Sequence, residues 1–206
     1  MTLHVLEHSL AAHILAQLRA GDTSPQQFRS LTHALTCLLV VEATRTLPTR
    51  SQTIQTPLEP TEAAMFQQGF VAIPVLRAGL GMLDPVLELL PDVTVGYVGM
   101  ARDEETAIAA SYYCKLPPLE DKTVLLLDPM VATGGSAAAA IDRLHDAGAR
   151  KILLLCVVAA PEGITFLTDR FPEVDIFAAA LDRELNAQKY ILPGLGDFGD
   201  RLYGTL

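Results

Sequence analysis

The stretch Thr123 to Ser136, TVLLLDPMVATGGS, decides the fold that we expect for this chain. Four apolar residues, Val124 to Leu127, are typical of a buried strand, and the chain then breaks at Asp128-Pro129. Thr133-Gly134-Gly135-Ser136 leads into an alanine-rich segment that we interpret as a helix. The order is therefore strand, turn and helix start. A loop of small and hydroxyl-bearing residues at this point lets backbone N–H groups approach a phosphate closely.

Taken alone, the TGGS sequence has a second interpretation. It is also compatible with an ordinary helix whose first turn is capped by Thr133 or Ser136. It is not a Walker loop, because no Gly-Lys-Ser/Thr follows, and it does not match GxGxxG. The choice between a phosphate site and a capped helix therefore depends on the neighbouring segments.

Strands and helices alternate along most of the chain. Apolar runs predict strands at 70–76, 93–99, 124–127, 151–158 and 174–181, with a return strand at 111–115. Helical spacing, prolines and glycines predict helices at 9–20, 25–46, 81–90, 136–147 and 163–170. Continuous apolar strands indicate a parallel sheet covered on both faces. We predict one α/β domain of 206 residues, an open parallel sheet flanked by helices, with its core at about 68–185.

Two segments do not fit this alternation. Residues 50–61, RSQTIQTPLEPT, predict an edge strand or an arm that could reach a partner subunit. Residues 190–204, YILPGLGDFGDRLYG, have neither helical nor strand period, yet their apolar residues indicate that they pack. Ordered glycine-rich backbone usually means that the main chain itself contacts something. We expect residues 186–206, with N-terminal segments, to form a hood over the core.

Composition excludes several classes of function. The net charge of −9 argues against nucleic acid as a partner, because phosphate backbones require a basic face. The longest apolar run, 152–160, is far shorter than the roughly 20 residues that span a bilayer, so we expect no membrane partner. No signal peptide is evident, and the three cysteines are far apart in sequence. We therefore expect a reduced, cytoplasmic location.

Two arginines follow predicted strands as Asp128 does. Arg77 comes directly after the strand at 70–76, and Arg102 follows the strand at 93–99. The carboxyl ends of parallel strands meet at one edge of a sheet, so we expect these side chains on the same rim as the loop. Arginine donates paired hydrogen bonds to phosphate oxygens. The combination predicts a site for a sugar that carries a diphosphate.

At this point the sequence resembles a known family. VLLLDPMVATGGS is similar to the 5-phosphoribosyl 1-diphosphate (PRPP) motif of type I phosphoribosyltransferases, and Asp128-Pro129 resembles the variant in uracil phosphoribosyltransferases. The resemblance extends over essentially the whole chain and keeps the family's order. The further matching segments are IPVLRAGLGMLD (73–84), VGMARDEET (98–106), KLPP (115–118), AAPEG (159–163) and YILPGLGDFGDRLYGT (190–205).

The resemblance implies a reaction and a role for each matching residue. Uracil and PRPP would give UMP and diphosphate, with Mg²⁺ as cofactor carried by PRPP. Arg77 and Arg102 would contact the diphosphate and Asp128 the ribose hydroxyls. Asp197 would face PRPP and its metal, and the backbone of Ile191 and of Gly196 to Phe198 would read uracil. The remaining PRPP contacts would come from Pro129, Met130, Val131, Ala132, Thr133, Gly134, Gly135 and Ser136.

Two positions depart from the family pattern, which usually has a small residue where Phe198 stands and an aromatic one where Ala101 stands. A Phe198 ring turned into the pocket would narrow it. Two alternatives stay open: a pyrimidine- or PRPP-sensing regulator without turnover, and a phosphoribosyltransferase for another base. We expect residues 103–112 to act as a lid that excludes water. The resemblance also implies a homodimer or larger homo-oligomer, and GTP as an effector for which the sequence indicates no site.

Overall fold

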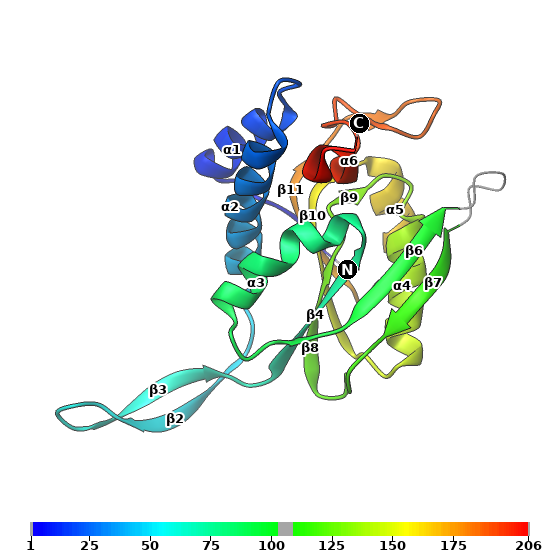
Figure 1. Ribbon diagram of the computed structural model, residues 1–206. Helices are drawn as coiled ribbons and strands as arrows, with labels where there is room; N and C mark the ends of the chain where they lie inside the picture. Colours follow the sequence, from blue (N-terminus) through cyan, green and yellow to red (C-terminus); the bar gives the residue numbers. More distant parts are fainter. Residues whose placement is uncertain (1, 103–108, 206) are drawn as a thin grey trace.

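The computed structural model describes residues 2–102 and 109–205. Within them, a nine-stranded sheet carries helices on both faces (Figure 1). Its principal strands lie in the order β1 (Leu3–Val5), β11 (Asp175–Leu181), β10 (Lys151–Ala159), β8 (Lys122–Leu127), β4 (Gly69–Leu76), β6 (Tyr97–Arg102) and β7 (Ala109–Lys115). Two short strands, β5 (Thr94–Val95) and β9 (Met130–Val131), pair with β4 and β10. Every pairing in this sheet is parallel except that of β6 with β7, which confirms the predicted fold class.

Two helical layers cover the sheet. One face carries α1 (Ser9–Arg19), α2 (Pro25–Thr44), the 3-10 helix η1 (Ala78–Met82) and α3 (Leu83–Leu89). The other face carries α4 (Gly135–Asp146) and α5 (Pro161–Arg170). In β8, Leu125 and Leu127 point to the first layer, and Val124 and Leu126 point to the second. All four are fully buried, each worth about 1.5–3 kcal/mol, which explains why the strand is apolar without alternation.

The predicted helix signals have the expected local structure. Ser24 caps α2: its hydroxyl accepts from the Gln27 N–H at 3.3 Å, and the Gln27 side chain accepts from the Ser24 N–H at 3.2 Å. Pro25 is the first helical residue. Gly148 follows α4 with φ +90°, the left-handed conformation that ends many helices. Among the described residues, no helix is long and apolar enough to cross a membrane.

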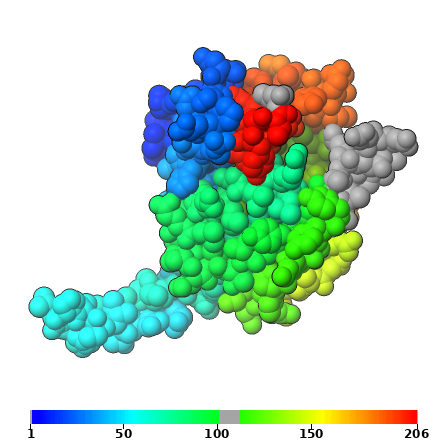
Figure 2. All heavy atoms as spheres, in the orientation of Figure 1, coloured from blue at the N-terminus to red at the C-terminus, as the bar shows by residue number. Residues whose placement is uncertain are grey.

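The arm predicted at 50–61 is a hairpin. Strands β2 (Thr49–Gln55) and β3 (Pro60–Phe66) pair in antiparallel fashion, so the arm is longer than the sequence pattern indicates. It projects away from the body of the protein, as Figures 1 and 2 show. Almost all of its side chains are exposed in the single chain.

Three other details differ from the sequence-based expectation. The pattern does not predict β1, which is only three residues long and depends on its pairing with β11. The strand expected at 93–99 is divided into β5 and β6, which pair with different parts of β4. The tail expected to lack regular structure contains β13 (Ile191–Leu192), paired with β12 (Glu184–Leu185), and the helix α6 (Phe198–Tyr203). The lid expected at 103–112 falls partly on residues 103–108, which lie outside the described residues, and residues 109–112 belong to β7. Strand β7 confirms the return strand expected at 111–115.

Candidate active site

The site lies where the direction of the strand order reverses. From β4 the chain moves to β6 and β7 on one side, and it then returns to β8, β10 and β11 on the other. Ligands of open α/β sheets bind beyond the carboxyl ends of the strands at such a point. Arg77 directly follows β4, Arg102 is the last residue of β6, and Asp128 directly follows β8. The three predicted strand-end residues therefore belong to one edge of the sheet, although the Arg102 side chain lies outside what the structure describes.

The loop after Asp128 runs along β10 before it turns into α4. The Pro129 carbonyl accepts from the N–H groups of Val157, at 3.0 Å, and Val158, at 3.1 Å. The Val131 carbonyl accepts from the Ala160 N–H at 2.9 Å. Pro129 thus fixes the loop to the sheet and does not line the cavity described below.

The start of α4 decides between the two interpretations of TGGS. Gly134 is the N-cap residue with φ +79°. Among the described residues, no side chain accepts a hydrogen bond from the N–H groups at the start of α4. Neither Thr133 nor Ser136 therefore occupies the first N–H groups of the helix, as a capped helix requires. The N–H groups and the positive end of the helix dipole remain available to an anion. The capped-helix interpretation is wrong.

Loop and hood line one cavity of about 290 Å³. It brings together residues that are far apart in sequence, and the hood contributes Asp197. The other lining residues are Asp128, Met130, Val131, Ala132, Thr133, Gly134, Gly135, Ser136 and Ala137. This set includes most of the residues that the resemblance assigns to the phosphate and the ribose, and it joins them to an acid from the hood.

Two glycines let neighbouring elements approach the loop closely. A Cβ at Gly163, in the first turn of α5, would lie 2.3 Å from the Ala132 carbonyl oxygen. A Cβ at Gly79, in η1, would lie 2.3 Å from the Leu127 carbonyl oxygen. Both distances are far below van der Waals contact, so any side chain at either position would displace the end of β8 or its loop. The sequence interpretation placed Gly163 at the start of a helix and gave it no packing role, although glycine allows a close approach of backbone that a side chain would prevent.

Asp128 is the buried acid of the site. Asp128 is 9% exposed. Burial raises the pKa of its carboxyl from 3.8 to about 7, and a hydrogen bond from the Met130 N–H opposes that shift. Burial and the nearby Asp128 charge also raise the pKa of the Cys156 thiol on β10. A ligand that brings hydroxyl donors or a cation to Asp128 would stabilise its ionised form.

A divalent cation fits this donor set only together with a ligand. In residues 2–102 and 109–205, no cluster of three or more His, Cys, Asp or Glu side chains is arranged to hold a metal ion. Asp128 and Asp197 nevertheless line the same cavity. Mg²⁺ commonly uses one or two carboxylates, substrate phosphates and water, so two acids beside an anion loop are compatible with it.

The hood residues differ in where their side chains lie. Ile191 is buried in the core, and Gly196 has φ +82°, a backbone conformation that favours glycine. Asp197 is exposed and caps α6 by accepting from the Asp200 N–H at 2.9 Å. Phe198 is 1% exposed, and its ring packs edge-to-face on Phe28 with centroids 5.0 Å apart. Its ring therefore points into the core rather than the cavity, so it does not narrow the pocket.

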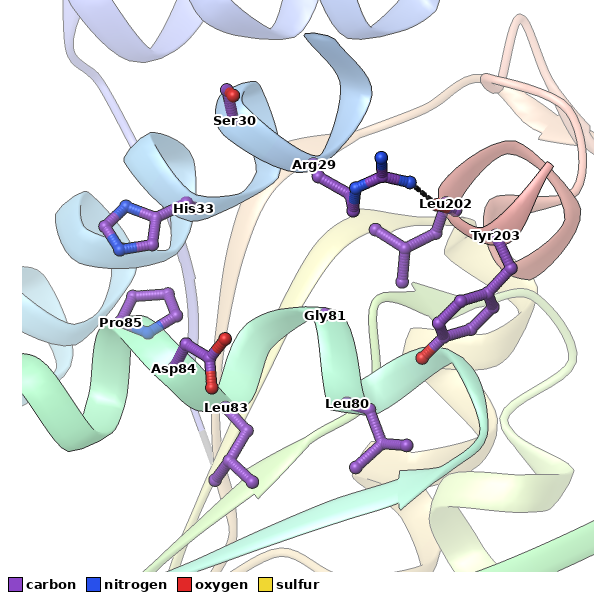
Figure 3. A pocket seen from close by; sticks show the side chains of 10 residues that line it. All are labelled: Arg29, Ser30, His33, Leu80, Gly81, Leu83, Asp84, Pro85, Leu202 and Tyr203. Carbon is purple, nitrogen blue, oxygen red and sulfur yellow. Dashed lines mark hydrogen bonds between the residues drawn. The ribbon is translucent and has the colours of Figure 1, made fainter. Parts of the chain in front are cut away.

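A larger hollow of about 590 Å³ lies between α2, η1, α3 and α6 (Figure 3). Its walls are mainly apolar, and its cation, Arg29, donates to the Leu202 carbonyl at 2.8 Å. On the same wall, the Tyr203 hydroxyl donates to the Arg77 carbonyl at 3.2 Å. This hollow is lined neither by the loop at 129–136 nor by Asp128 or Asp197, so it is not the candidate active site. Its contacts hold α6 against the segment that carries Arg77.

The sequence interpretation missed the side chains that fix the hood. Arg201 donates to the carbonyls of Leu18, at 2.6 Å, and Leu195, at 2.7 Å. Asp182 accepts a hydrogen bond from the Gly194 N–H, and Arg19 donates one to the Gly194 carbonyl. Asp182 directly follows β11, so the rule that found Asp128 at the end of β8 could have identified it.

Comparison with known proteins agrees with this geometry. The family model described as uracil phosphoribosyltransferase matches residues 5–205. A uracil phosphoribosyltransferase of Fervidobacterium nodosum is 46% identical over 205 residues, covering 98% of this chain and 99% of that protein. One from Thermosipho africanus is 45% identical over 207 residues, covering 100% of both.

Solved structures extend the likeness to three dimensions. The AQ2163 protein from Aquifex aeolicus superposes with a TM-score of 0.94 at 36% identity, covering 98% of both chains. A purine phosphoribosyltransferase from Pyrococcus horikoshii shares the fold, with a TM-score of 0.50 at 16% identity over 75% of this chain and 89% of that one. Family model, relatives and fold point the same way, and the chain belongs to the uracil phosphoribosyltransferase family.

Proposed function

We propose that this chain transfers the 5-phosphoribosyl group from PRPP to uracil, giving UMP and diphosphate, and so serves pyrimidine salvage. The observation that carries the proposal is the cavity that joins Asp128, the uncapped start of α4 and the hood residue Asp197 at the reversal point of the sheet. Relatives that match the whole chain at about 45% identity are named for this activity.

The residues at the site suggest how PRPP would be oriented there. The N–H groups at the start of α4 bind the 5-phosphate, because they are oriented together and lack a side-chain cap. Asp128 accepts hydrogen bonds from the ribose hydroxyls, which offset the cost of its burial. Arg77 and Arg102, after β4 and β6, donate to the diphosphate.

The chemistry follows from this orientation. The uracil N1 attacks ribose C1 as the bond from C1 to the diphosphate oxygen breaks, and the electron pair leaves with diphosphate. Positive charge develops on the sugar near Asp128 and negative charge on the leaving group near Arg77 and Arg102. Mg²⁺, held through PRPP phosphates with Asp197 nearby, would supply further charge neutralisation. Asp197 is also the candidate acceptor for the N1 proton.

Uracil recognition is assigned to the hood backbone at Ile191 and Gly196 to Phe198. A main chain held in one conformation presents donors and acceptors in a fixed order, as the edge of uracil does. A base with a different order would leave buried groups unpaired, so discrimination should be strong. The Phe198 ring packs on Phe28, which supports a pocket of ordinary width for uracil.

The test is diphosphate release with a panel of nucleobases, with and without Mg²⁺. Uracil with Mg²⁺ should give release, and Asp128→Asn or Arg102→Ala should lower it strongly. Release with a purine but not uracil would favour another base specificity, and binding of PRPP without release for any base would favour a regulator. Wild-type rates in both variants would refute the residue assignments. Adding GTP to the same assay tests the predicted effector.

We also propose a homodimer or larger homo-oligomer in which the β2–β3 hairpin contacts a partner copy. The hairpin projects from the body with nearly all of its side chains exposed, and an isolated two-stranded hairpin is marginally stable. Replacing residues 53–62 with a two-residue turn should shift the chain to a smaller species in sedimentation. An unchanged mass would contradict this role.

A further inference from the structure

A partly buried ion pair lies beneath the hood. Arg19 is the last residue of α1, and Asp182 directly follows β11, so the two come from opposite parts of the sequence. Both guanidinium terminal nitrogens donate to the Asp182 carboxylate, one of them at 2.9 Å. The Asp182 side chain is 4% exposed and that of Arg19 is 23% exposed. The Asp182 N–H donates to the Ala159 carbonyl at 2.8 Å, which ties the acid to the end of β10.

Both members of the pair bind the backbone of the same hood residue. The Gly194 N–H donates to Asp182 Oδ2 at 2.9 Å, and the Gly194 carbonyl accepts from Arg19 Nη1 at 2.6 Å. Gly194 has φ +61°, and a Cβ there would lie 2.2 Å from the Ile191 carbonyl oxygen. The ion pair therefore fixes both peptide groups of a residue that only glycine can occupy without displacement.

The next residue is fixed from the other side. Arg201 donates to the Leu195 carbonyl at 2.7 Å and packs its guanidinium over the Phe28 ring at 4.7 Å. Residues 194 and 195 are thus held by charged side chains. Gly196, Asp197 and Phe198 follow at once, and these residues carry the proposed uracil contacts.

The chemistry of the pair favours a positioning role over a general contribution to stability. Burying two charges costs free energy that their attraction only partly recovers, and apolar replacements are often equally stable. What an apolar pair cannot provide is an acceptor for the Gly194 N–H and a donor for the Gly194 carbonyl. Backbone recognition of a base needs such fixed peptide groups, because an error of about 1 Å in position can cost about 100-fold in rate.

We propose that Asp182 and Arg19 are positioning residues that fix the base-reading backbone of the hood. The inference rests on the proposed function, which it deepens by naming the groups that set affinity for the base. Neither Arg19 nor Asp182 lines the cavity formed by Asp128 and the loop after it. Loss of the pair should therefore weaken uracil recognition much more than PRPP binding.

Three variants and one matched control test the proposal. Asp182→Asn and Arg19→Gln break the paired hydrogen bonds, and Arg19→Lys keeps the charge but not the two-pronged geometry. The control is Asp175→Asn, at the other end of the same strand β11, where the carboxylate pairs with Lys151 at 2.9 Å. That pair is partly exposed and lies outside the cavity lined by Asp128 and Asp197.

Steady-state kinetics and hydrogen exchange are measured on each purified full-length protein. We expect Asp182→Asn and Arg19→Gln to raise KM for uracil about 10-fold or more, as loss of supporting groups around a site commonly does, with KM for PRPP nearly unchanged. Arg19→Lys should fall between them and wild type, and Asp175→Asn should match wild type. Exchange of the amides at 194–198 should accelerate in Asp182→Asn and Arg19→Gln, to a smaller extent in Arg19→Lys, and not in Asp175→Asn.

Two outcomes would overturn the proposal. One is an equal rise in KM for uracil and for PRPP, and the other is unchanged exchange at 194–198 in a folded variant of Asp182 or Arg19. If Asp182→Asn does not fold, Arg19→Lys still decides through the same measurements. If wild type shows no turnover of uracil, the proposed function fails, and the exchange experiment still decides whether the pair positions the hood.

Discussion

Replacing Asp128 with asparagine should stabilise the ligand-free protein while it removes activity. Asparagine has nearly the same shape, and its side-chain oxygen can still accept from the Met130 N–H. The difference is charge: burial raises the pKa of Asp128 from 3.8 to about 7, so the ionised carboxylate is disfavoured in the folded state. The substitution removes that penalty, and it also removes the charge that the ribose and its developing cation require.

The magnitude and sign follow from proton linkage. Between about pH 4 and pH 7 the folded protein keeps a proton that the unfolded chain has released, so this group lowers stability as pH rises through that window. Each unit of difference in pKa corresponds to about 1.4 kcal/mol, so the buried carboxylate lowers the free energy of unfolding by about 4 kcal/mol above about pH 8. At about pH 5 only about 1.7 kcal/mol of it is present, so the difference between variant and wild type should widen by about 2.5 kcal/mol between these two pH values.

Urea unfolding of both proteins at the two pH values, without ligand, measures this change. Other titrating groups are common to both proteins and cancel in the comparison. A stability difference independent of pH would refute the argument that Asp128 is a buried, destabilised carboxylate. So would a variant that is less stable than wild type at the higher pH. The same variant should lose about 100-fold or more in kcat/KM, as removal of a charge-stabilising group typically does.

Three further predictions concern the loop, the hood and the metal. Gly163→Ala should displace Ala132, raise KM for PRPP about 10-fold and lower Tm, because the new Cβ would lie 2.3 Å from the Ala132 carbonyl oxygen. The control is Gly21→Ala, where the new Cβ would have no atom within 4 Å, and it should match wild type in kinetics. Phe198→Ala should destabilise the protein by about 3–5 kcal/mol in urea unfolding, because its ring fills the core against Phe28. The base preference of that variant in the nucleobase assay should not change, and a new preference would contradict the core placement of the ring. Chelation of Mg²⁺ should abolish diphosphate release and excess Mg²⁺ should restore it, whereas release in excess chelator would contradict the role of the metal.

The sheet and one rim of the site could be predicted from the sequence. Strands buried on both faces are continuous apolar runs, and β8 is one of them, so Asp128 stands out where the run stops. The same reasoning located Arg77 and Arg102 at the ends of their strands. These inferences needed only local patterns and the rule that ligands bind at carboxyl ends of parallel strands.

The parts that could not be predicted depend on contacts between distant residues. Arg19 and Asp182 are 163 positions apart, and neither has a local motif that names its partner. The sequence does not show which way the Phe198 ring points, because that depends on its contact with Phe28 on α2. Helix α6 has six residues, too short for a period to be visible, although the Asp197 cap was a local signal for its start.

The most direct test of the central claim is to follow the purified chain with PRPP, Mg²⁺ and uracil by phosphorus NMR. The account predicts that the PRPP signals decline while those of UMP and diphosphate grow at equal rates. It also predicts that omitting uracil leaves PRPP intact over the same time. PRPP that stays intact in the presence of uracil, or that is consumed without formation of UMP, would contradict the account.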